Sequence, residues 1–282
     1  MRTPAPVNYR KQTRTPEAIA RATDYAISML DGYTMWWRYH GPSQDARSAR
    51  PFEGRRILEI GPGASLGSAV LLACAGATVS IADRFVPEWD PDFHGPFYAE
   101  LLRKVDGRGE AFASPIRRLI EARGFTPDVV TCHAIAAEQL WRTGERFDVV
   151  FSNAVLEHVE NLEATTRNLA AVTELGGYGF HQIDLRDHRD FDRPLEFLTL
   201  SARAFERLRS ESFCECGCPW RMPDFKAAFE ISGFQITHAS SNLSATPEYL
   251  ADVRPRLRPE YRQFSEADLA AISAFFVVSR PA

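Results

Sequence analysis

The sequence predicts an α/β fold in which helices cover both faces of a mostly parallel, seven-stranded sheet, with a helical cap at the N-terminus. Two observations carry this prediction. Short apolar runs alternate with helical runs from Arg55 onward, and a glycine-rich turn at 61–67 follows the first apolar run directly. Such alternation favours parallel strands, because each connection between two of them places a helix on one face of the sheet.

The N-terminal cap is predicted from helix signals. Thr15 is a suitable N-cap, Pro16 suits the first helical position, and apolar side chains then recur at helical spacing. Gly32 is expected to end this helix. The following polar stretch is expected to link a cap or lid, at residues 1–54, to the main domain.

The main domain is expected at residues 55–282, with insertions at about 84–127 and 186–221. Strands are expected at 57–60, 78–82, 128–133, 146–152, 178–185, 235–238 and 272–279. Helices are expected at 65–75, 98–105, 114–123, 161–175, 222–232 and 264–271. Gly176 and Gly177 are expected to close the helix before the fifth strand as its C-cap.

The composition is that of an ordinary globular protein and argues against several functions. The 282 residues are 45% hydrophobic and 25% charged, which suits one large domain or one domain with a cap. The net charge of −4 leaves no basic footprint for nucleic acid. No apolar run approaches a membrane span, and the N-terminus lacks a signal-peptide core. We therefore expect a cytoplasmic protein without nucleic-acid or membrane partners; its oligomeric state is left open.

The glycine turn and two acids point to a bound nucleoside. Gly61 and Gly63 would let a ligand approach the backbone closely. Asp83 lies at the end of the second strand, 24 residues after Glu59, where a carboxylate can accept hydrogen bonds from both hydroxyls of a ribose. A unit of strand, glycine turn, helix, strand and acid is typical of nucleoside-binding α/β domains.

These features, together with the segment 147–159 (Phe-Asp-Val-Val-Phe-Ser-Asn-Ala-Val-Leu-Glu-His-Val) and the paired glycines before the fifth strand, resemble the class I S-adenosylmethionine-dependent methyltransferases. The narrower similarity is to bacterial small-molecule enzymes of specialised metabolism. The resemblance implies a Rossmann-like sheet and S-adenosylmethionine as the cofactor. It also implies transfer of a methyl group, by direct displacement, to an oxygen or nitrogen nucleophile of a small organic acceptor of the natural-product kind.

The resemblance further implies a set of cofactor contacts. Glu59 would lie near the methionyl amine and Asp83 at the ribose, while Ala137 and Glu138 would lie near the adenine. The full set is Glu59, Gly61, Gly63, Ser65, Asp83, Arg84, Ala137, Glu138, Asn153, Ala154 and His158. Ser65 departs from the family, which often has a third glycine at this position.

Two other functions remain open at this point. A glycine turn after a strand also begins NAD(P)-binding domains, so an oxidoreductase on a similar sheet is an alternative. However, no Tyr-x-x-x-Lys pair occurs, so the catalytic couple of short-chain dehydrogenases is missing. The second alternative is a non-catalytic S-adenosylmethionine-binding module.

No metal site is predicted. Some members of the resembled family hold a divalent cation with two carboxylates and a histidine in the segment around His158, but the residue three before Glu157 is Ala154. Cys214, Cys216 and Cys218 are spaced unlike the usual zinc ligands and are expected to be free thiols.

An acceptor that must lose a proton needs a base, which is expected just after the fifth strand. His188 is the predicted base or orienting group, with Asp184 in support. The acceptor site is expected to be lined by Gln182 and by aromatic residues of the cap, namely Tyr33, Trp36, Trp37 and Tyr39. The alternative for the aromatic residues is that they pack the cap onto the sheet.

Overall fold

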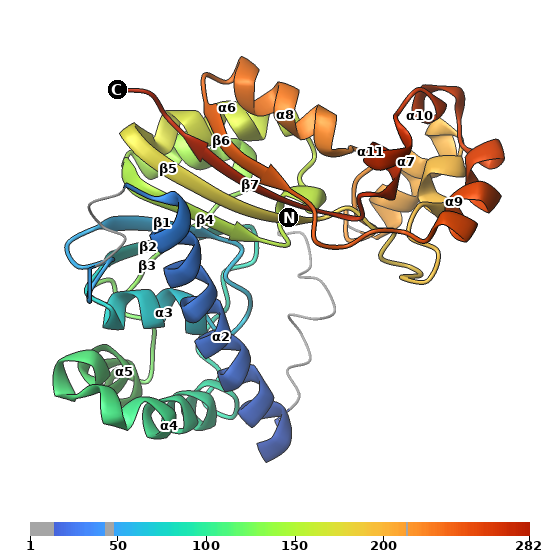
Figure 1. Ribbon diagram of the computed structural model, residues 1–282. Coiled ribbons are helices and arrows are strands. Elements are labelled where there is room, and N and C mark those ends of the chain that lie inside the picture. The colour runs from blue at the N-terminus through green and yellow to red at the C-terminus, as the bar shows by residue number, and fades with distance from the viewer. Residues whose placement is uncertain (1–13, 43–47, 213) are drawn as a thin grey trace.

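The computed structural model describes residues 14–42, 48–212 and 214–282, and it confirms the predicted α/β fold. The strands are β1 (Arg56–Ile60), β2 (Thr78–Asp83), β3 (Thr131–Ala134), β4 (Phe147–Asn153), β5 (Thr173–Asp184), β6 (Gln235–Ser240) and β7 (Ser273–Ser279). They form one seven-stranded sheet in the order β3-β2-β1-β4-β5-β7-β6 (Figure 1). The strands β1 to β5 are parallel, whereas β7 runs antiparallel to both of its neighbours.

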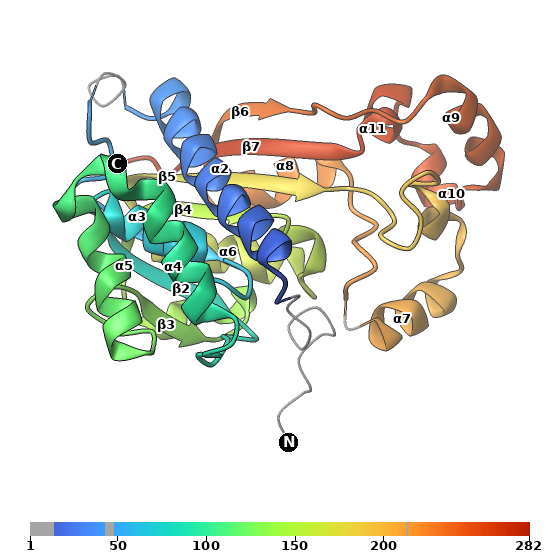
Figure 2. The same cartoon turned by 90° about the horizontal axis from the view of Figure 1, so that it is seen from below.

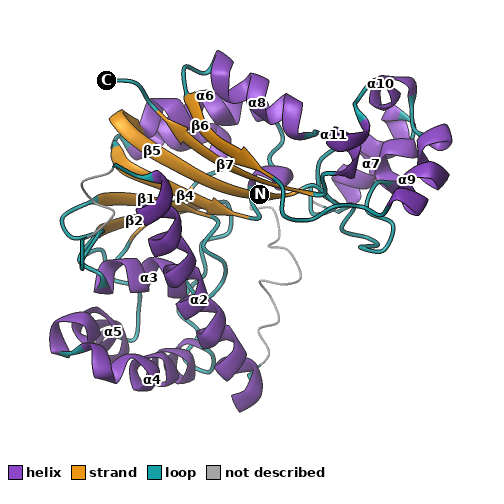
Figure 3. Ribbon diagram, in the orientation of Figure 1, coloured by secondary structure: helices purple, strands orange, loops and turns teal. Residues whose placement is uncertain are grey.

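Helices cover both faces of this sheet (Figure 3). One face carries α2 (Pro16–His40), α3 (Gly67–Cys74), α4 (His94–Val105) and α5 (Glu110–Ala122), and the other carries α6 (Leu162–Val172) and α8 (Met222–Ile231). An apolar core lies on each face of the sheet, between the sheet and its helices. Successive side chains of β1 point into different cores: Ile57 faces the first set of helices and Leu58 the second. Among the described helices, none is both long and apolar enough to cross a membrane.

The first described helix is longer than predicted, since α2 continues to His40 and is followed by Gly41 as its C-cap. Its buried side chains continue at helical spacing through Tyr33 to Trp37. A glycine in a helix costs about 1 kcal/mol relative to alanine. Burial of two large aromatic side chains outweighs that cost, so the prediction that Gly32 ends the helix was wrong. Because α2 shares its core with the sheet, it lies across the sheet face (Figure 2).

The paired glycines before Tyr178 also have a different role from the predicted one. The helix α6 ends at Val172, and Thr173 already begins β5. Gly176 has φ +77° within this strand and donates its N–H to the carbonyl of Arg280 at 2.7 Å. The register of β5 against β4 shifts nearby. The glycines therefore belong to an irregular strand, not to a helix C-cap.

A helical lobe, formed by residues 186–212 and 241–272, lies beyond the carboxyl end of β5 (Figures 1 and 2). It contains α7 (Ala202–Glu211), α9 (Pro247–Val253), α10 (Pro259–Arg262), α11 (Glu266–Ala270) and short 3-10 helices at 196–199 and 254–256. Its two segments share a separate apolar core and are joined by Arg256, which pairs with both carboxylate oxygens of Glu196 at 2.8 and 2.9 Å. Of these helices, only the one at 264–271 is expected from the sequence.

Candidate active site

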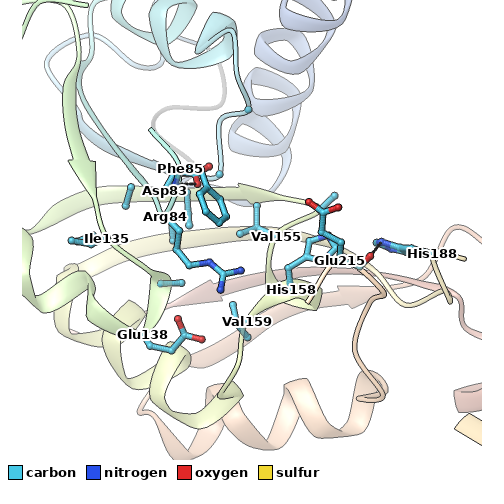
Figure 4. A pocket seen from close by; sticks show the side chains of 16 residues that line it. Asp83, Arg84, Phe85, Ile135, Glu138, Val155, His158, Val159, His188 and Glu215 are labelled. Carbon is cyan, nitrogen blue, oxygen red and sulfur yellow. Dashed lines mark hydrogen bonds between the residues drawn. The ribbon is translucent and has the colours of Figure 1, made fainter. Parts of the chain in front are cut away.

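A cavity of about 500 Å³ opens at the carboxyl ends of β1, β2 and β4. The strand order reverses between β1 and β4, and open α/β sheets bind their ligands at such a point. Figure 4 shows Ile135 and Glu138 at one end of this cavity, and His158, His188 and Glu215 together at the other.

The glycine turn brings bare backbone to the cavity. Gly61 has φ +64°, and a Cβ there would lie 2.4 Å from Cγ2 of Val155. Gly63 has φ +74° and also lines the cavity, but an added Cβ would meet no atom within 4 Å. Gly61 is thus required because a side chain there would collide with Val155. Gly63 leaves a space beside the backbone that a ligand can enter.

The end of the cavity near β2 suits a nucleoside. Asp83 ends β2, and its Oδ1 accepts the backbone N–H of Phe85 at 2.8 Å. The ring of Phe85 and the aliphatic side chain of Ile135 line this part of the cavity as apolar walls. Glu138 lies beside them, and one of its oxygens accepts the backbone N–H of Glu160 at 2.7 Å.

Glu59 lies behind the glycine turn and is 2% exposed. Its Oε1 accepts two hydrogen bonds, from the hydroxyls of Tyr33 and Ser68, each at 2.7 Å. Its Oε2 has no hydrogen-bond partner among the described residues. Burial raises the pKa of Glu59 to about 7, although both hydroxyls act to lower it. Nearby, the side-chain amide of Asn153 donates to the hydroxyl of Tyr25 at 3.0 Å.

Two histidines meet at the opposite end of the cavity. Nδ1 of His158 lies 2.8 Å from the carbonyl oxygen of Cys214, and Nδ1 of His188 lies 3.1 Å from that of Glu215. Because a carbonyl only accepts, we assign the proton of each neutral ring to Nδ1, which leaves each Nε2 as an acceptor. Oδ2 of Asp184 lies 3.7 Å from Nε2 of His188. Burial acts to raise the pKa of Asp184, but hydrogen bonds from Arg186 bring it below its ordinary value.

These two rings share their corner with Glu157, which is 1% exposed. Neither carboxylate oxygen of Glu157, nor Nε2 of His188, has a hydrogen-bond partner within the described parts of the chain. One ligand atom from each of Glu157, His158 and His188 lies within 4.8 Å of the others. Two imidazole nitrogens and a carboxylate oxygen are a donor set for divalent transition metals, and carbonyl-anchored Nδ1 atoms are typical of metal-binding histidines. These residues fit a divalent cation.

The expectation that no metal is held rested on Ala154, which lacks a carboxylate. His188 reaches the same corner from a different strand end, a contact that no local spacing indicates. The three cysteines are free thiols, and among the described residues they form no cluster of metal-ligating groups with one another.

Most of the predicted cofactor residues come together. Those that line the cavity are Gly61, Gly63, Asp83, Arg84, Ala137, Glu138, Ala154 and His158, and His188 joins them. Glu59, Ser65 and Asn153 are not among the lining residues; Ser65 accepts the hydroxyl of Tyr98 with its carbonyl oxygen at 2.6 Å. Glu157 and Glu215 were missed as parts of the site. The Glu-His pair in the segment 147–159 is the signal that could have indicated Glu157.

The residues predicted to bind the acceptor do not line this cavity. Tyr33 and Trp37 are each 1% exposed and pack onto the sheet, whereas Tyr39 is 80% exposed. Trp36 packs against Phe275. Together with Gln182 on β5, these residues are absent from the lining of the described cavity. Tyr33 and Trp37 therefore follow the alternative given above, in which the aromatic residues pack the helix onto the sheet.

Comparisons with known proteins indicate the family to which the chain belongs. A family model described as a methyltransferase domain matches residues 43–239. The chain is 32% identical over 137 residues to the ubiquinone biosynthesis O-methyltransferase of Rhizobium leguminosarum bv. trifolii, and 33% identical over 131 residues to the mitochondrial enzyme of that name from Arabidopsis thaliana. These matches cover 49% and 46% of this chain but only 43% and 33% of the two relatives. The chain thus matches less than half the length of either relative.

Among solved structures, an S-adenosylmethionine-dependent methyltransferase from Mesorhizobium loti aligns with a TM-score of 0.45 and 15% identity, over 89% of this chain and 100% of that chain. The family match covers well over half of the present chain and includes the glycine turn, Asp83 and His158. It decides against the nicotinamide-dependent alternative. The chain therefore belongs to the class I S-adenosylmethionine-dependent methyltransferases and uses S-adenosylmethionine as its cofactor.

Proposed function

We propose that this enzyme methylates a hydroxyl oxygen of a small organic acceptor, of the kind found in specialised metabolism. The observation that carries this proposal is the pair of histidines at the end of the cavity opposite the nucleoside site, each with Nε2 available as an acceptor. A hydroxyl nucleophile must lose its proton, and an imidazole is suited to receive it. The two relatives named as O-methyltransferases support oxygen over nitrogen.

In the proposed reaction, a lone pair of the acceptor oxygen forms a bond to the methyl carbon of the cofactor. The bond from that carbon to sulfur breaks, its electron pair stays on sulfur, and S-adenosylhomocysteine leaves. The hydroxyl proton passes to Nε2 of His188. The carbonyl of Glu215 orients the ring through Nδ1, and the Asp184 carboxylate, 3.7 Å from Nε2, stabilises the charged form of the ring. Alignment of the two reactants is the largest contribution, worth about 7–11 kcal/mol in favourable intramolecular reactions.

The cluster of Glu157, His158 and His188 extends this proposal. A divalent cation bound there would act as a Lewis acid and favour ionisation of an acceptor hydroxyl. In that case His188 serves as a ligand. In either case His158 and His188 line the proposed acceptor end of the cavity, beside the buried Glu157.

The acceptor is proposed to reach this corner from a second cavity of about 290 Å³, between the helical lobe and the main domain. Glu157 and Val159 line it from the main domain, and Phe205 and Tyr261 line it from the lobe. Trp220 adds a further aromatic wall. These walls and this volume suit an acceptor with one or two rings. Cytoplasmic action is part of the proposal, and the five free thiols support it.

The test is a product assay with S-adenosylmethionine and a panel of monocyclic and bicyclic phenols, catechols and aromatic amines, read by mass spectrometry. A gain of one methyl group on a hydroxyl oxygen is the expected result. Methylation of the amines alone would move the assignment to nitrogen. If the protein binds S-adenosylhomocysteine but methylates no member of a broad panel, a non-catalytic binding role is favoured instead.

A further inference from the structure

We infer that helix α2 is part of the cofactor site, and that Tyr33 is a positioning residue that holds the Glu59 carboxylate for the amino-acid end of S-adenosylmethionine. This inference concerns the cofactor and does not depend on the acceptor. It assigns the aromatic side of α2 a role at the donor end of the reaction, distinct from the acceptor wall that the sequence suggested.

The hydrogen bonds of Glu59 are unequally divided. Tyr33 and Ser68 both donate to Oε1, whereas the buried Oε2 has no partner in the described structure. A buried carboxylate oxygen without a donor is costly, so such an atom calls for a missing partner. Glu59 directly precedes Ile60 and Gly61, which line the cofactor cavity. The ammonium group at the amino-acid end of the cofactor is a donor of the required charge.

Tyr33 is itself held in place. Its ring stacks on Phe151 with centroids 4.2 Å apart and planes 13° from parallel. Phe151 is the residue of β4 that pairs in register with Glu59 of β1. The ring of Tyr33 thus rests on the neighbour of the carboxylate that its hydroxyl contacts. Rotation of the ring away from Glu59 would break this stack.

A second contact joins the same face of α2 to the neighbouring strand end. Tyr25, Met29 and Tyr33 follow one another at four-residue spacing, so they share one face of the helix. The amide nitrogen of Asn153 lies 3.0 Å from the hydroxyl of Tyr25 and 3.6 Å from Sδ of Met29. The helix therefore bridges the ends of β1 and β4, the two strands between which the sheet order reverses.

Docking of α2 and binding of the cofactor are then linked. An ammonium group at Oε2 favours the ionised form of Glu59, and an ionised carboxylate accepts a stronger hydrogen bond from Tyr33. By reciprocity, whatever fixes Tyr33 strengthens cofactor binding, and cofactor binding strengthens the attachment of α2.

Calorimetry with two ligands tests this inference. S-adenosylhomocysteine carries the amino-acid end, whereas 5′-methylthioadenosine lacks it but keeps the adenosine and the sulfur. In Tyr33→Phe only the hydroxyl is lost, and we expect the affinity for S-adenosylhomocysteine to fall about tenfold, as for loss of one hydrogen bond to a charged group. The affinity for 5′-methylthioadenosine should stay within about twofold of wild type.

Tyr249→Phe is the matched control, because the Tyr249 hydroxyl accepts the backbone N–H of Leu195 at 2.9 Å within the helical lobe. It should bind both ligands as the wild type does. Ser68→Ala, which removes the second donor to Oε1, should repeat the Tyr33→Phe pattern. Unchanged affinity for S-adenosylhomocysteine in Tyr33→Phe would overturn the inference, and so would an equal loss for both ligands, which indicates general disturbance of the fold. Failure of the wild type to bind S-adenosylhomocysteine would contradict the cofactor assignment itself.

Discussion

The rings of His158 and His188 lie with their centroids 5.0 Å apart, at an angle of 70°, although one residue follows β4 and the other follows β5. Their Nδ1 atoms are held by the carbonyls of two consecutive residues, Cys214 and Glu215. A single loop therefore orients both rings, and both histidines line the end of the cavity away from Asp83. This arrangement is the basis of the first prediction.

His188→Ala should lower kcat/KM by about 10²–10⁴-fold, the usual range for loss of a general base, while the affinity for S-adenosylhomocysteine stays near the wild-type value. The affinity should be retained because His188 lines the end of the cavity away from Asp83. Steady-state kinetics with an acceptor from the assay, together with calorimetry, provide the two measurements. His238→Ala, on β6, is the control histidine. Turnover that is undiminished in His188→Ala would remove His188 from the mechanism.

The fold could be predicted from local patterns to the extent that each element carries its own signal. All seven strands were expected, because most of them contain a short apolar run and turn residues separate them from the helical runs. The end of α2 was not, because the stop signal at Gly32 is local, whereas the burial of Tyr33 and Trp37 that overrides it depends on the sheet. The two segments of the helical lobe are joined by contacts between residues distant in sequence, namely a shared apolar core and the pair of Glu196 and Arg256.

The candidate site likewise contains residues that local motifs indicate and contacts that only the folded chain creates. Gly61, Asp83 and His158 lie in compact motifs, so their spacing indicated their place. The meeting of His158 with His188 needs the sheet and the anchoring loop, which no spacing reveals. The aromatic stretch indicated a buried or binding surface, but the sequence could not tell that the Tyr33 hydroxyl is buried and donates to Glu59.

The second prediction concerns the metal. After treatment with EDTA and removal of the chelator, Zn²⁺ or Mn²⁺ should raise the melting temperature of the wild type, because a ligand that binds only the folded state stabilises it. Glu157→Gln removes the negative charge of the cluster and His188→Ala removes one imidazole ligand, so each should greatly reduce or abolish the rise, whereas His238→Ala should keep it. Differential scanning fluorimetry measures the shift. An equal rise in all four proteins would mean that the cation binds elsewhere on the surface.

The third prediction compares two glycines of the same turn. Gly61→Ala should destabilise the fold by about 2–4 kcal/mol, since it combines a left-handed backbone with a Cβ in the space of Val155. Gly63→Ala should cost only about 1–2 kcal/mol, because its Cβ meets no atom of the described chain and only the backbone cost remains. Its main effect should be weaker binding of S-adenosylhomocysteine. Urea unfolding and calorimetry on both variants separate the two effects, and equal stability losses would contradict the comparison.

The fourth prediction follows from the pKa of Glu59, which burial raises to about 7. The ammonium of the cofactor pairs with the ionised carboxylate, so below pH 7 binding must first expel a proton. The affinity for S-adenosylhomocysteine should therefore be about tenfold lower at pH 6 than at pH 8, as expected for a single group with this pKa. The groups that act on Glu59 from the surrounding elements are the hydroxyls of Tyr25 and Tyr33 on α2 and of Ser68 on α3.

The ligand-free protein should show the opposite trend in stability. Because the folded-state pKa of Glu59 lies above its unfolded value of 4.5, the folded protein holds a proton that the unfolded chain has released between about pH 4.5 and 7. The contribution of Glu59 to stability is thus complete below pH 4.5 and is lost as the pH rises towards 7. Glu59→Gln cannot titrate, so it should flatten both profiles, and its affinity for S-adenosylhomocysteine should be low throughout. If the affinity of Glu59→Gln for S-adenosylhomocysteine still changed with pH as in the wild type, the pH dependence would belong to another group. Glu59 would then not be the partner of the cofactor's ammonium group.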